Sequence, residues 1–416
     1  MKRPIFLRVG AVVVAGLMLL GACQGEDEAV DPSDSTSDLT APAGTVVTST
    51  GDPTAEEPPN TEEPTDNGIS ASEVSSTTEA PLETTTTTTT TGVIAGSSST
   101  ISASEDNFPP STTTTTLYIP VSPVSGLPVD DLSLLDRRLV AVKIDNHRMA
   151  RPQSGIEEAD GMIELVVEGG VTRFIALFHH SDSSWLGPMR SIRPTDWTLA
   201  KALNGVLVIS GGQPWILNQV VSNDVPMIGD LGPPLTTRLR ERAAPHNLYV
   251  NTFEARLIAE ERNLDPRPPP ALFNRGPTSA SPLSPATYIF FDWTDSIDVV
   301  WHWDGSQYLR STNGQSHQWL TQDGDSGPIT ADVLVVLSAE RYTACPTGSG
   351  SCVPAWRTVG ENRAVVFAEG RAEEGRWTRA DTSDWFTLTG LTGEPIIVPP
   401  GRTWIMIYPE TAELVW

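Results

Sequence analysis

The fold of this chain is indicated by a stretch that reads Leu139-Val140-Ala141-Val142-Lys143-Ile144-Asp145-Asn146-His147. Apolar residues alternate with others through Leu139–Ile144, as they do in a half-buried β-strand. The polar residues Asp145, Asn146 and His147 follow directly, at the place where loops of an α/β sheet usually build binding sites. We therefore predict a strand that leads into a functional loop.

Segments typical of strands and of helices alternate around this stretch, as in an α/β fold. Asn251 and Glu254 have the spacing of a capping box, which places the start of a helix there. The predicted strands are Gly161–Val167, Val171–His179 and Gly205–Ser210, and the predicted helices are Pro194–Leu203, Pro214–Val221 and Asn251–Arg262.

After a proline-rich break at residues 265–270, the pattern changes to short strands separated by Gly, Asp and Asn turns. Trp301 and Trp303 share one strand face, for which buried core is favoured over a stacking platform for sugar rings. We predict an α/β (α+β) fold in two domains, an α/β domain over 118–265 and a mostly antiparallel β domain over 271–416. The strands predicted for the second domain are Thr287–Asp292, Asp298–Trp303, Tyr308–Ser311, Val333–Ser338, Ala364–Ala368, Gly375–Ala380 and Arg402–Tyr408.

The beginning of the chain has the features of a bacterial lipoprotein signal. Three basic residues precede an apolar run from residue 9 to residue 20, which is shorter than the about 20 apolar residues that span a bilayer. The run ends in Leu20-Gly21-Ala22-Cys23, which is similar to a lipobox. We predict a signal peptide over 1–22 and a lipidated (palmitate-bearing) Cys23 that anchors the chain to the extracytoplasmic face of the cell membrane. The alternative is an ordinary signal peptide with a chance cysteine.

Residues 23–117 are predicted to form a disordered tether rich in Thr, Ser and Pro. Residues 24–117 contain 17 acidic residues and no Lys or Arg, and such a composition cannot bury enough apolar surface to fold. The whole chain has a net charge of −25, of which −11 remains from Tyr118 onward. This acidic balance argues against nucleic acid as a partner, because phosphate contacts need clustered cations.

Cys345 and Cys352 flank a six-residue loop of Pro, Thr, Gly and Ser. In an exported protein this arrangement predicts a disulfide that closes the tip of a hairpin. A metal-binding pair is the alternative, but no second Cys/His pair lies nearby in the sequence.

Several motifs occur in series along the folded part. They are Ala141–His147, Arg151–Gly155, Glu168–Phe174, Gly187–Pro194 and Ala244–Tyr249, followed by Gly375–Trp377 and Pro400–Trp404. In order and spacing they resemble the YerB-like lipoproteins, the DUF3048 family, over roughly residues 122–410. The resemblance implies a layered α/β sandwich and an envelope location, and it implies no reaction.

Arginines are conspicuous in the N-terminal half of this otherwise acidic protein. Their planar guanidinium groups suit carboxylates and phosphates, so we predict a pocket for an anionic ligand, to which the amides of Ser210-Gly211-Gly212 also contribute. Internal pairs with Asp160, Glu164, Glu168 or Asp196 would explain the same arginines without a ligand. The predicted ligand-binding residues are Asp145, Asn146, His147, Arg151, Arg173, Arg190, Arg193, His246 and Asn247.

A catalytic interpretation depends on His147 and His246 with Asp145, because a histidine oriented by a carboxylate can act as a general base. No familiar nucleophile motif accompanies them, and both histidines can equally serve backbone hydrogen bonds. His179 and His180 point to opposite faces of a strand, so neither a metal site nor a cofactor is predicted.

The sequence favours a non-enzymatic, membrane-anchored lipoprotein that binds an anionic envelope ligand or a partner protein through a cleft lined by Arg and His. One alternative is an envelope hydrolase or lyase that uses His147 or His246 with Asp145. Another is a structural adaptor in cell-wall assembly. Convergence of the two histidines with Arg190 and Arg193 on one cleft would separate the first two hypotheses from the third.

Overall fold

The computed structural model describes residues 119–277 and 283–416. The predicted signal peptide, Cys23 and the tether lie outside these residues. Within them, no helix is both long enough and apolar enough to cross a membrane. The helices are α1 (Asp196–Ala202), α2 (Pro214–Ser222) and α3 (Thr252–Glu261), with 3-10 turns at Leu132–Leu135, Arg148–Ala150, Ile156–Glu158 and Glu168–Gly170.

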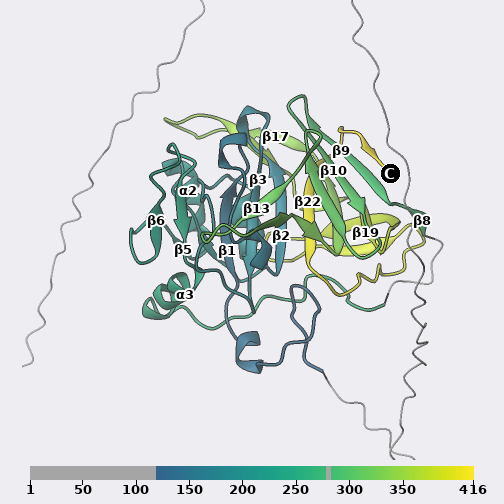
Figure 1. Ribbon diagram of the computed structural model, residues 1–416, viewed down its shortest axis with the longest axis horizontal. Helices are drawn as coiled ribbons and strands as arrows, with labels where there is room; N and C mark the ends of the chain where they lie inside the picture. The colour runs from purple at the N-terminus through teal and green to yellow at the C-terminus, as the bar shows by residue number, and fades with distance from the viewer. Residues whose placement is uncertain (1–118, 278–282) are drawn as a thin grey trace, which may run out of the picture. The chain divides into compact units, whose positions relative to one another are not determined.

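An eleven-stranded mixed sheet runs through the described part of the chain (Figure 1). Its strand order is β21-β20-β19-β16-β22-β2-β3-β1-β4-β5, with β8 paired to β20. The strands are β1 (Val140–Asp145), β2 (Gly161–Val166), β3 (Thr172–Phe178), β4 (Val206–Val208), β5 (Met227–Ile228), β8 (Ser284–Pro285), β16 (Val333–Ala339), β19 (Gly360–Ala368), β20 (Arg371–Arg379), β21 (Thr387–Gly390) and β22 (Thr403–Pro409).

A second, six-stranded antiparallel sheet has the order β12-β11-β10-β9-β23, with β15 paired to β11. Its strands are β9 (Tyr288–Thr294), β10 (Ile297–Trp303), β11 (Tyr308–Thr312), β12 (Gln315–Ser316), β15 (Thr330–Ala331) and β23 (Leu414–Val415). Two-stranded pairs complete the fold: β6 (Thr236–Arg238) with β7 (Leu248–Val250), β13 (Gln318–Leu320) with β14 (Ser326–Pro328), and β17 (Arg341–Ala344) with β18 (Val353–Trp356). The mixed α/β class, with antiparallel sheets in the C-terminal half, is as predicted.

Strand β1 is buried along its whole length, whereas alternation predicted a half-buried strand. The reason is that its sheet is covered on both faces. On one face the Lys143 ammonium contacts Asp196 of α1 at 2.8 Å. On the other face, Trp404 of β22 packs edge-on against Trp301 of β10, with ring centroids 5.1 Å apart. The main sheet therefore lies between helices and the second sheet.

The predicted core role of Trp301 is confirmed, because its side chain is fully buried. Trp303, two residues further along β10, is only partly buried and packs against Tyr308 at a centroid distance of 5.0 Å. Neither residue forms an open stacking surface on its own strand. The shared strand face instead seals the second sheet onto the first.

The two halves of the sequence share the main sheet. Strand β22 pairs in parallel with β2 on one side and with β16 on the other, so a C-terminal strand lies beside an N-terminal one. The predicted domain boundary, residues 265–271, falls in a segment without helix or strand. The sheet continues across that boundary, so the interior of the sheet is common to both halves.

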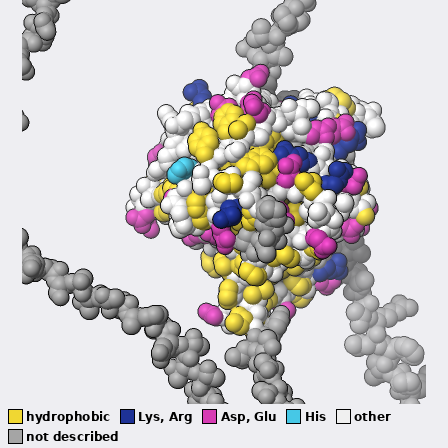
Figure 2. Space-filling view, turned by 90° about the vertical axis from the view of Figure 1, so that its right-hand side faces the viewer, with side chains coloured by type: hydrophobic (Ala, Val, Ile, Leu, Met, Phe, Trp, Pro, Cys, Tyr) yellow, Lys and Arg dark blue, Asp and Glu magenta, His cyan; other side chains and the backbone are white. Residues whose placement is uncertain are grey.

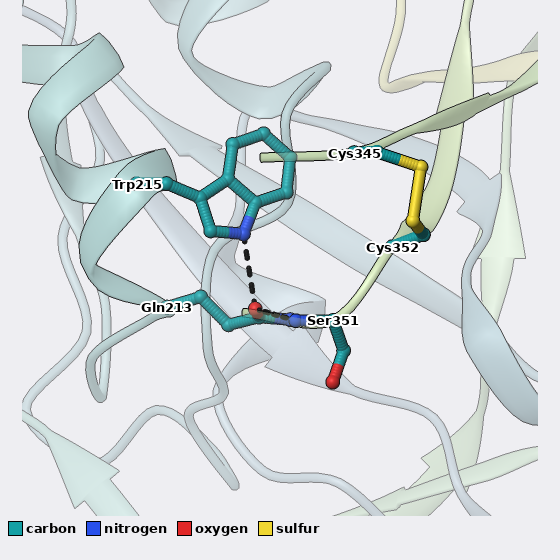
Figure 3. The surroundings of a disulfide bond; sticks show 5 residues. All are labelled: Gln213, Trp215, Cys345, Ser351 and Cys352. Atoms are coloured by element: carbon teal, nitrogen blue, oxygen red, sulfur yellow. Dashed lines mark hydrogen bonds between the residues drawn. A yellow bond between two sulfur atoms is a disulfide. The ribbon is translucent and has the colours of Figure 1, made fainter. Parts of the chain in front are cut away.

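The predicted disulfide between Cys345 and Cys352 is present and closes the hairpin of β17 and β18 (Figure 3). Within its loop, the Ser351 amide donates to Gln213 Oε1 at 2.9 Å, and Trp215 Nε1 donates to the same oxygen at 2.9 Å. The hairpin thus contacts the first turn of α2. The Ser210 amide was predicted to contribute to an anion site. It instead donates to the Arg190 carbonyl at 3.1 Å and is therefore not free for an anion.

Candidate functional site

Asp145 is the centre of a buried polar cluster at the end of β1. Its carboxylate is almost completely buried, and its Oδ2 lies 2.6 Å from His246 Nδ1 and 3.2 Å from Arg190 Nε. Its Oδ1 accepts a hydrogen bond of 3.0 Å from the His147 amide. Three of the predicted site residues therefore meet at one carboxylate, which compensates its burial.

The two histidines of this cluster stack on one another. Their ring centroids are 4.6 Å apart at an interplanar angle of 14°. His147 Nδ1 accepts a hydrogen bond from the Met149 amide at 3.3 Å, so it caps the 3-10 turn that begins at Arg148. Burial, and then the neighbouring His246, lower the pKa of His147. His147 is therefore neutral at neutral pH, and its predicted role as a backbone hydrogen-bond partner is present.

A second polar network begins at the next residue, Asn146. Its side-chain oxygen accepts from Arg151 Nε at 2.9 Å and from Gln153 Nε2 at 3.1 Å. Gln153 Oε1 lies 2.9 Å from Nε2 of His317, a residue of the C-terminal half. Burial, and then Arg310, lower the pKa of His317 well below its ordinary value, so this histidine is neutral. The network therefore joins the loop after β1 to the second sheet.

The same network contains a completely buried ion pair between the two sheets. Arg310 of β11 donates through Nη1 and Nη2 to the two carboxylate oxygens of Glu164 on β2, both at 2.8 Å. Thr172 and Trp404 also donate to this carboxylate, at 2.8 and 3.0 Å. Glu164 was considered as a partner for the N-terminal arginines, but its partner lies 146 residues away.

The other predicted arginines are occupied. Arg193 donates to Glu168 through Nε at 2.5 Å and also contacts it through Nη2, and Arg173 Nη2 lies 3.5 Å from the same carboxylate. Arg173 also donates to the Ser191 carbonyl at 3.0 Å. His147, His246 and Arg190 meet at the buried carboxylate of Asp145 and not in an open cleft, and Arg193 pairs elsewhere. Internal pairing thus accounts for Arg173 and Arg193.

Asn247 and the adjacent residues His179 and His180 have local structural roles. The Asn247 amide donates to the carbonyls of Leu239 and Arg242, both at 3.2 Å, and so holds its own loop. His179 Nε2 lies 3.1 Å from the Arg137 carbonyl, and His180 Nδ1 lies 2.9 Å from Asp160. The described residues contain no cluster of His, Cys, Asp or Glu that could hold a metal ion.

A cavity of about 540 Å³ opens beside the Asn146 network, between the turn after β1 and the strands β11 to β14. This volume lies within the range of about 300–1,000 Å³ that is common for ligand sites. The described residues that line it include two arginines and no aspartate or glutamate. They are Arg148, Arg151, Pro152, Thr312, Gln315, Ser316, His317, Gln318, Trp319, Leu320 and Ser326.

Of these lining residues, only Arg151 was predicted from the sequence to bind a ligand. Arg148 directly follows the first motif and differs from the four predicted arginines in being exposed. The polar stretch from Gln315 to Trp319, with a histidine at its centre, lies in the C-terminal half and carries no catalytic or binding motif. The bridge of Gln153 with Trp319 and the contact of Gln153 with His317 bring these segments together across the two halves.

The chain also matches known proteins along the part that builds this site. Models of the family described as "Protein of unknown function (DUF3048)" match residues 124–265 with its N-terminal domain and residues 288–405 with its C-terminal domain. This chain belongs to the DUF3048 family. The cavity takes Arg148 and Arg151 from the N-terminal DUF3048 domain and Trp319 from the C-terminal one.

A DUF3048 relative from Bacillus subtilis (strain 168), named "Putative lipoprotein YerB", is 26% identical over 304 residues, which cover 70% of this chain and 86% of the relative. The crystal structure of the YerB protein from Bacillus subtilis is similar with a TM-score of 0.61 at 24% identity, covering 71% of this chain and 99% of that one. The family resemblance and the fold predicted for DUF3048 proteins are both confirmed.

Proposed function

We propose that this protein is a lipid-anchored protein of the extracytoplasmic membrane face that binds an anionic envelope ligand in the cavity beside Arg148 and Arg151. The observation that carries the proposal is the charge of that cavity, which is lined by two guanidinium groups and no carboxylate among the described residues. The chain from Tyr118 onward has a net charge of −11, so this concentration of positive charge opposes the general trend. An anionic ligand would complement it.

The two arginines differ in how they are held. Arg148 is exposed and has no ion pair or hydrogen bond to any described residue. Arg151 is held through Nε and Nη2 by the side-chain oxygen and the carbonyl of Asn146, at 2.9 and 3.0 Å, and both of these acceptors are neutral. Burial lowers the pKa of Arg151 to about 10, so the group is still charged at neutral pH. A fixed cation beside an adjustable one suits the recognition of a carboxylate or phosphate.

Of the other predicted ligand residues, Asn146 supports the cavity from behind in this proposal. Asn146 orients Arg151, and Gln153 joins Asn146 to the buried His317 at the cavity wall. Such supporting hydrogen bonds hold a binding group in one geometry and so reduce the entropy lost on binding. Figure 2 shows one face of the protein, on which acidic and basic side chains are intermixed.

The location rests on the beginning of the chain and on the relative. The basic start, the short apolar run and Leu20-Gly21-Ala22-Cys23 are typical of a lipoprotein signal, and the Bacillus subtilis relative carries the word lipoprotein in its name. In this proposal the lipid on Cys23 makes the membrane a partner. The acidic tether of residues 23–117 then holds the folded part away from the membrane surface.

Binding is tested by titrating the wild-type protein with small anions, sugar acids and sugar phosphates while its melting temperature is recorded. A ligand that prefers the native state raises that temperature. Arg148→Glu should abolish the rise, because it reverses a charge on an exposed side chain without a partner. Arg240→Gln, at an exposed arginine outside the cavity lining, should leave the rise unchanged. Equal responses from both variants would refute the proposed site.

The anchor is tested by mass spectrometry of the protein purified from its native membrane. We expect the chain to begin at a diacylglyceryl-modified Cys23 and expect Cys23→Ala to move the protein out of the membrane fraction. An intact Met1, or an unmodified sulfur at residue 23, would refute the location and leave the cavity proposal standing.

The Asp145–His246 contact favours a second candidate, an envelope hydrolase or lyase. A carboxylate 2.6 Å from Nδ1 selects the tautomer in which Nε2 can accept a proton, and Arg190 lies beside the pair. His246→Gln should then remove turnover of ester, amide or glycoside test substrates while the melting temperature stays within a few degrees of the wild type. Absence of turnover in the wild-type protein across these substrates would exclude this candidate.

A further inference from the structure

Trp319 lines the cavity together with the two arginines, and its backbone pairs with Gln153, two residues after Arg151. It lies in β13 and pairs with Gly327 of β14 in an antiparallel register. The backbone of Gly327 lies so close to the indole that a Cβ at this position would be 2.6 Å from the ring. The glycine therefore provides a flat support on which the ring rests, and this support leaves the indole as a preformed surface beside the cavity.

Trp319 differs from Trp301 in its burial, because Trp301 is fully buried in the core. The Trp319 side chain is partly buried, and it lines the cavity. Its Nε1 has no hydrogen-bond partner among the described residues and is not among their buried unsatisfied atoms, so this donor is not completely buried. An aromatic face with an accessible N–H donor suits a ligand that is apolar on one side and hydroxylated at its edge.

The remaining wall of the cavity supplies neutral hydrogen-bonding groups. Gln315, Ser316 and Ser326 are exposed lining residues, and Gln318 Nε2 donates to Ser316 Oγ at 3.2 Å. Amides and hydroxyls of this kind both donate and accept, which is what the hydroxyl groups of a sugar require. Together with the ring and the arginines, they combine a stacking surface, a polar edge and a positive charge in one cavity.

We infer that the anionic ligand of this cavity is an acidic saccharide, whose pyranose ring stacks on Trp319 while its carboxylate or phosphate contacts Arg148 and Arg151. This inference rests on the proposed function and specifies its ligand class. A uronic acid and a glycosyl phosphate share the required chemistry, a sugar ring that carries an anion. A ligand with only one of the two features uses only part of the cavity.

Four small probes separate these features: glucuronate and glucose 6-phosphate carry both ring and anion, gluconate is an open-chain anion, and glucose is a neutral ring. Dissociation constants for the folded protein are measured by NMR titration at constant ionic strength. At least one ring anion should bind ten times more tightly than both gluconate and glucose. The better of the two ring anions identifies the charged group as carboxylate or phosphate.

Three variants at two positions separate the contributions of the ring and of the charge. Trp319→Leu should remove the preference for glucuronate or glucose 6-phosphate over gluconate and leave the gluconate affinity within twofold. Trp319→Phe should restore most of that preference, which a merely structural role would not predict. Arg148→Glu should weaken every anion at least fivefold and leave glucose unchanged. The melting temperature of each variant confirms that it is folded.

The outcomes distinguish this inference from the proposed function. If gluconate binds the wild-type protein as tightly as both ring anions, the saccharide inference is wrong and the anion site stands. If neither ring anions nor gluconate bind more tightly than glucose, both proposals fail. If Trp319→Leu weakens gluconate as much as glucuronate, the tryptophan is structural and the stacking assignment is overturned.

Discussion

Removing Arg310 tests whether the buried ion pair with Glu164 holds the two sheets together. Both side chains are fully buried, and the pair is bidentate at 2.8 Å. Arg310→Met leaves the Glu164 carboxylate without its cation, and breaking a buried pair in this way costs about 3–5 kcal/mol. With an unfolding entropy of about 2.1 cal/mol/K per residue over about 290 residues, the melting temperature should fall by roughly 5–8 °C.

The assay is urea and thermal unfolding of the wild type, Arg310→Met and the double variant Arg310→Met/Glu164→Gln. The double variant should be more stable than Arg310→Met alone, because glutamine removes the unpaired charge while it keeps an acceptor for Trp404. Arg376→Met is the matched control at an exposed pair with Glu361, where less than about 1 kcal/mol is expected. A cost below about 1 kcal/mol for Arg310→Met, or a double variant less stable than the single one, would refute this reasoning.

Three further changes in stability follow from the structure. Burial lowers the pKa of His179 to about 4, and burial also lowers the pKa of His317 well below its ordinary value. Because the unfolded chain then binds more protons, the unfolding free energy should fall by up to about 1.4 kcal/mol per pH unit for each histidine as the pH drops below about 6.5. Urea unfolding midpoints at pH 7, 6 and 5 check this prediction, and equal midpoints would contradict it. Replacing Cys345 and Cys352 by Ser removes a cross-link between residues seven apart, so unfolding midpoints should show a loss of about 2–3 kcal/mol. Trp301→Ala should cost about 3–5 kcal/mol in the same assay, and a loss below about 1 kcal/mol would argue against its core role.

Most strands of the main sheet, and β9 to β11 of the second sheet, could be predicted from the sequence, but short strands such as β12 to β15 and the partners of the strands could not. Alternation located β1, and apolar runs bounded by turn residues located β16 and β22. Which strands pair depends on tertiary packing, and nothing in the local pattern of β22 indicates that it lies between β16 and β2. The same limit explains the burial of β1, because the second sheet that covers it comes from residues far along the chain.

The site could be predicted only in part, because the contacts between its residues also depend on tertiary packing. His246 and Asp145 were associated by residue type, since a histidine and a carboxylate commonly pair, and the structure brings them together. Charge alone could not show which arginines are free to contact a ligand. Arg173 and Arg193 pair with Glu168, whereas Arg148 contacts no carboxylate among the described residues. Trp319 was passed over because its significance lies in Gly327 and in the cavity, both of which become adjacent to it only in the fold.

The position of β22 has a consequence for how the protein is made. Residues 403–409 occupy the interior of the main sheet, so a nascent chain that has emerged only as far as the preceding loop exposes the open edges of β2 and β16. The main sheet of such a chain stays open until residues 403–409 are available to pair. In the proposed export of this chain, late closure of the sheet is an advantage, because an unfolded chain can pass through a narrow secretion channel.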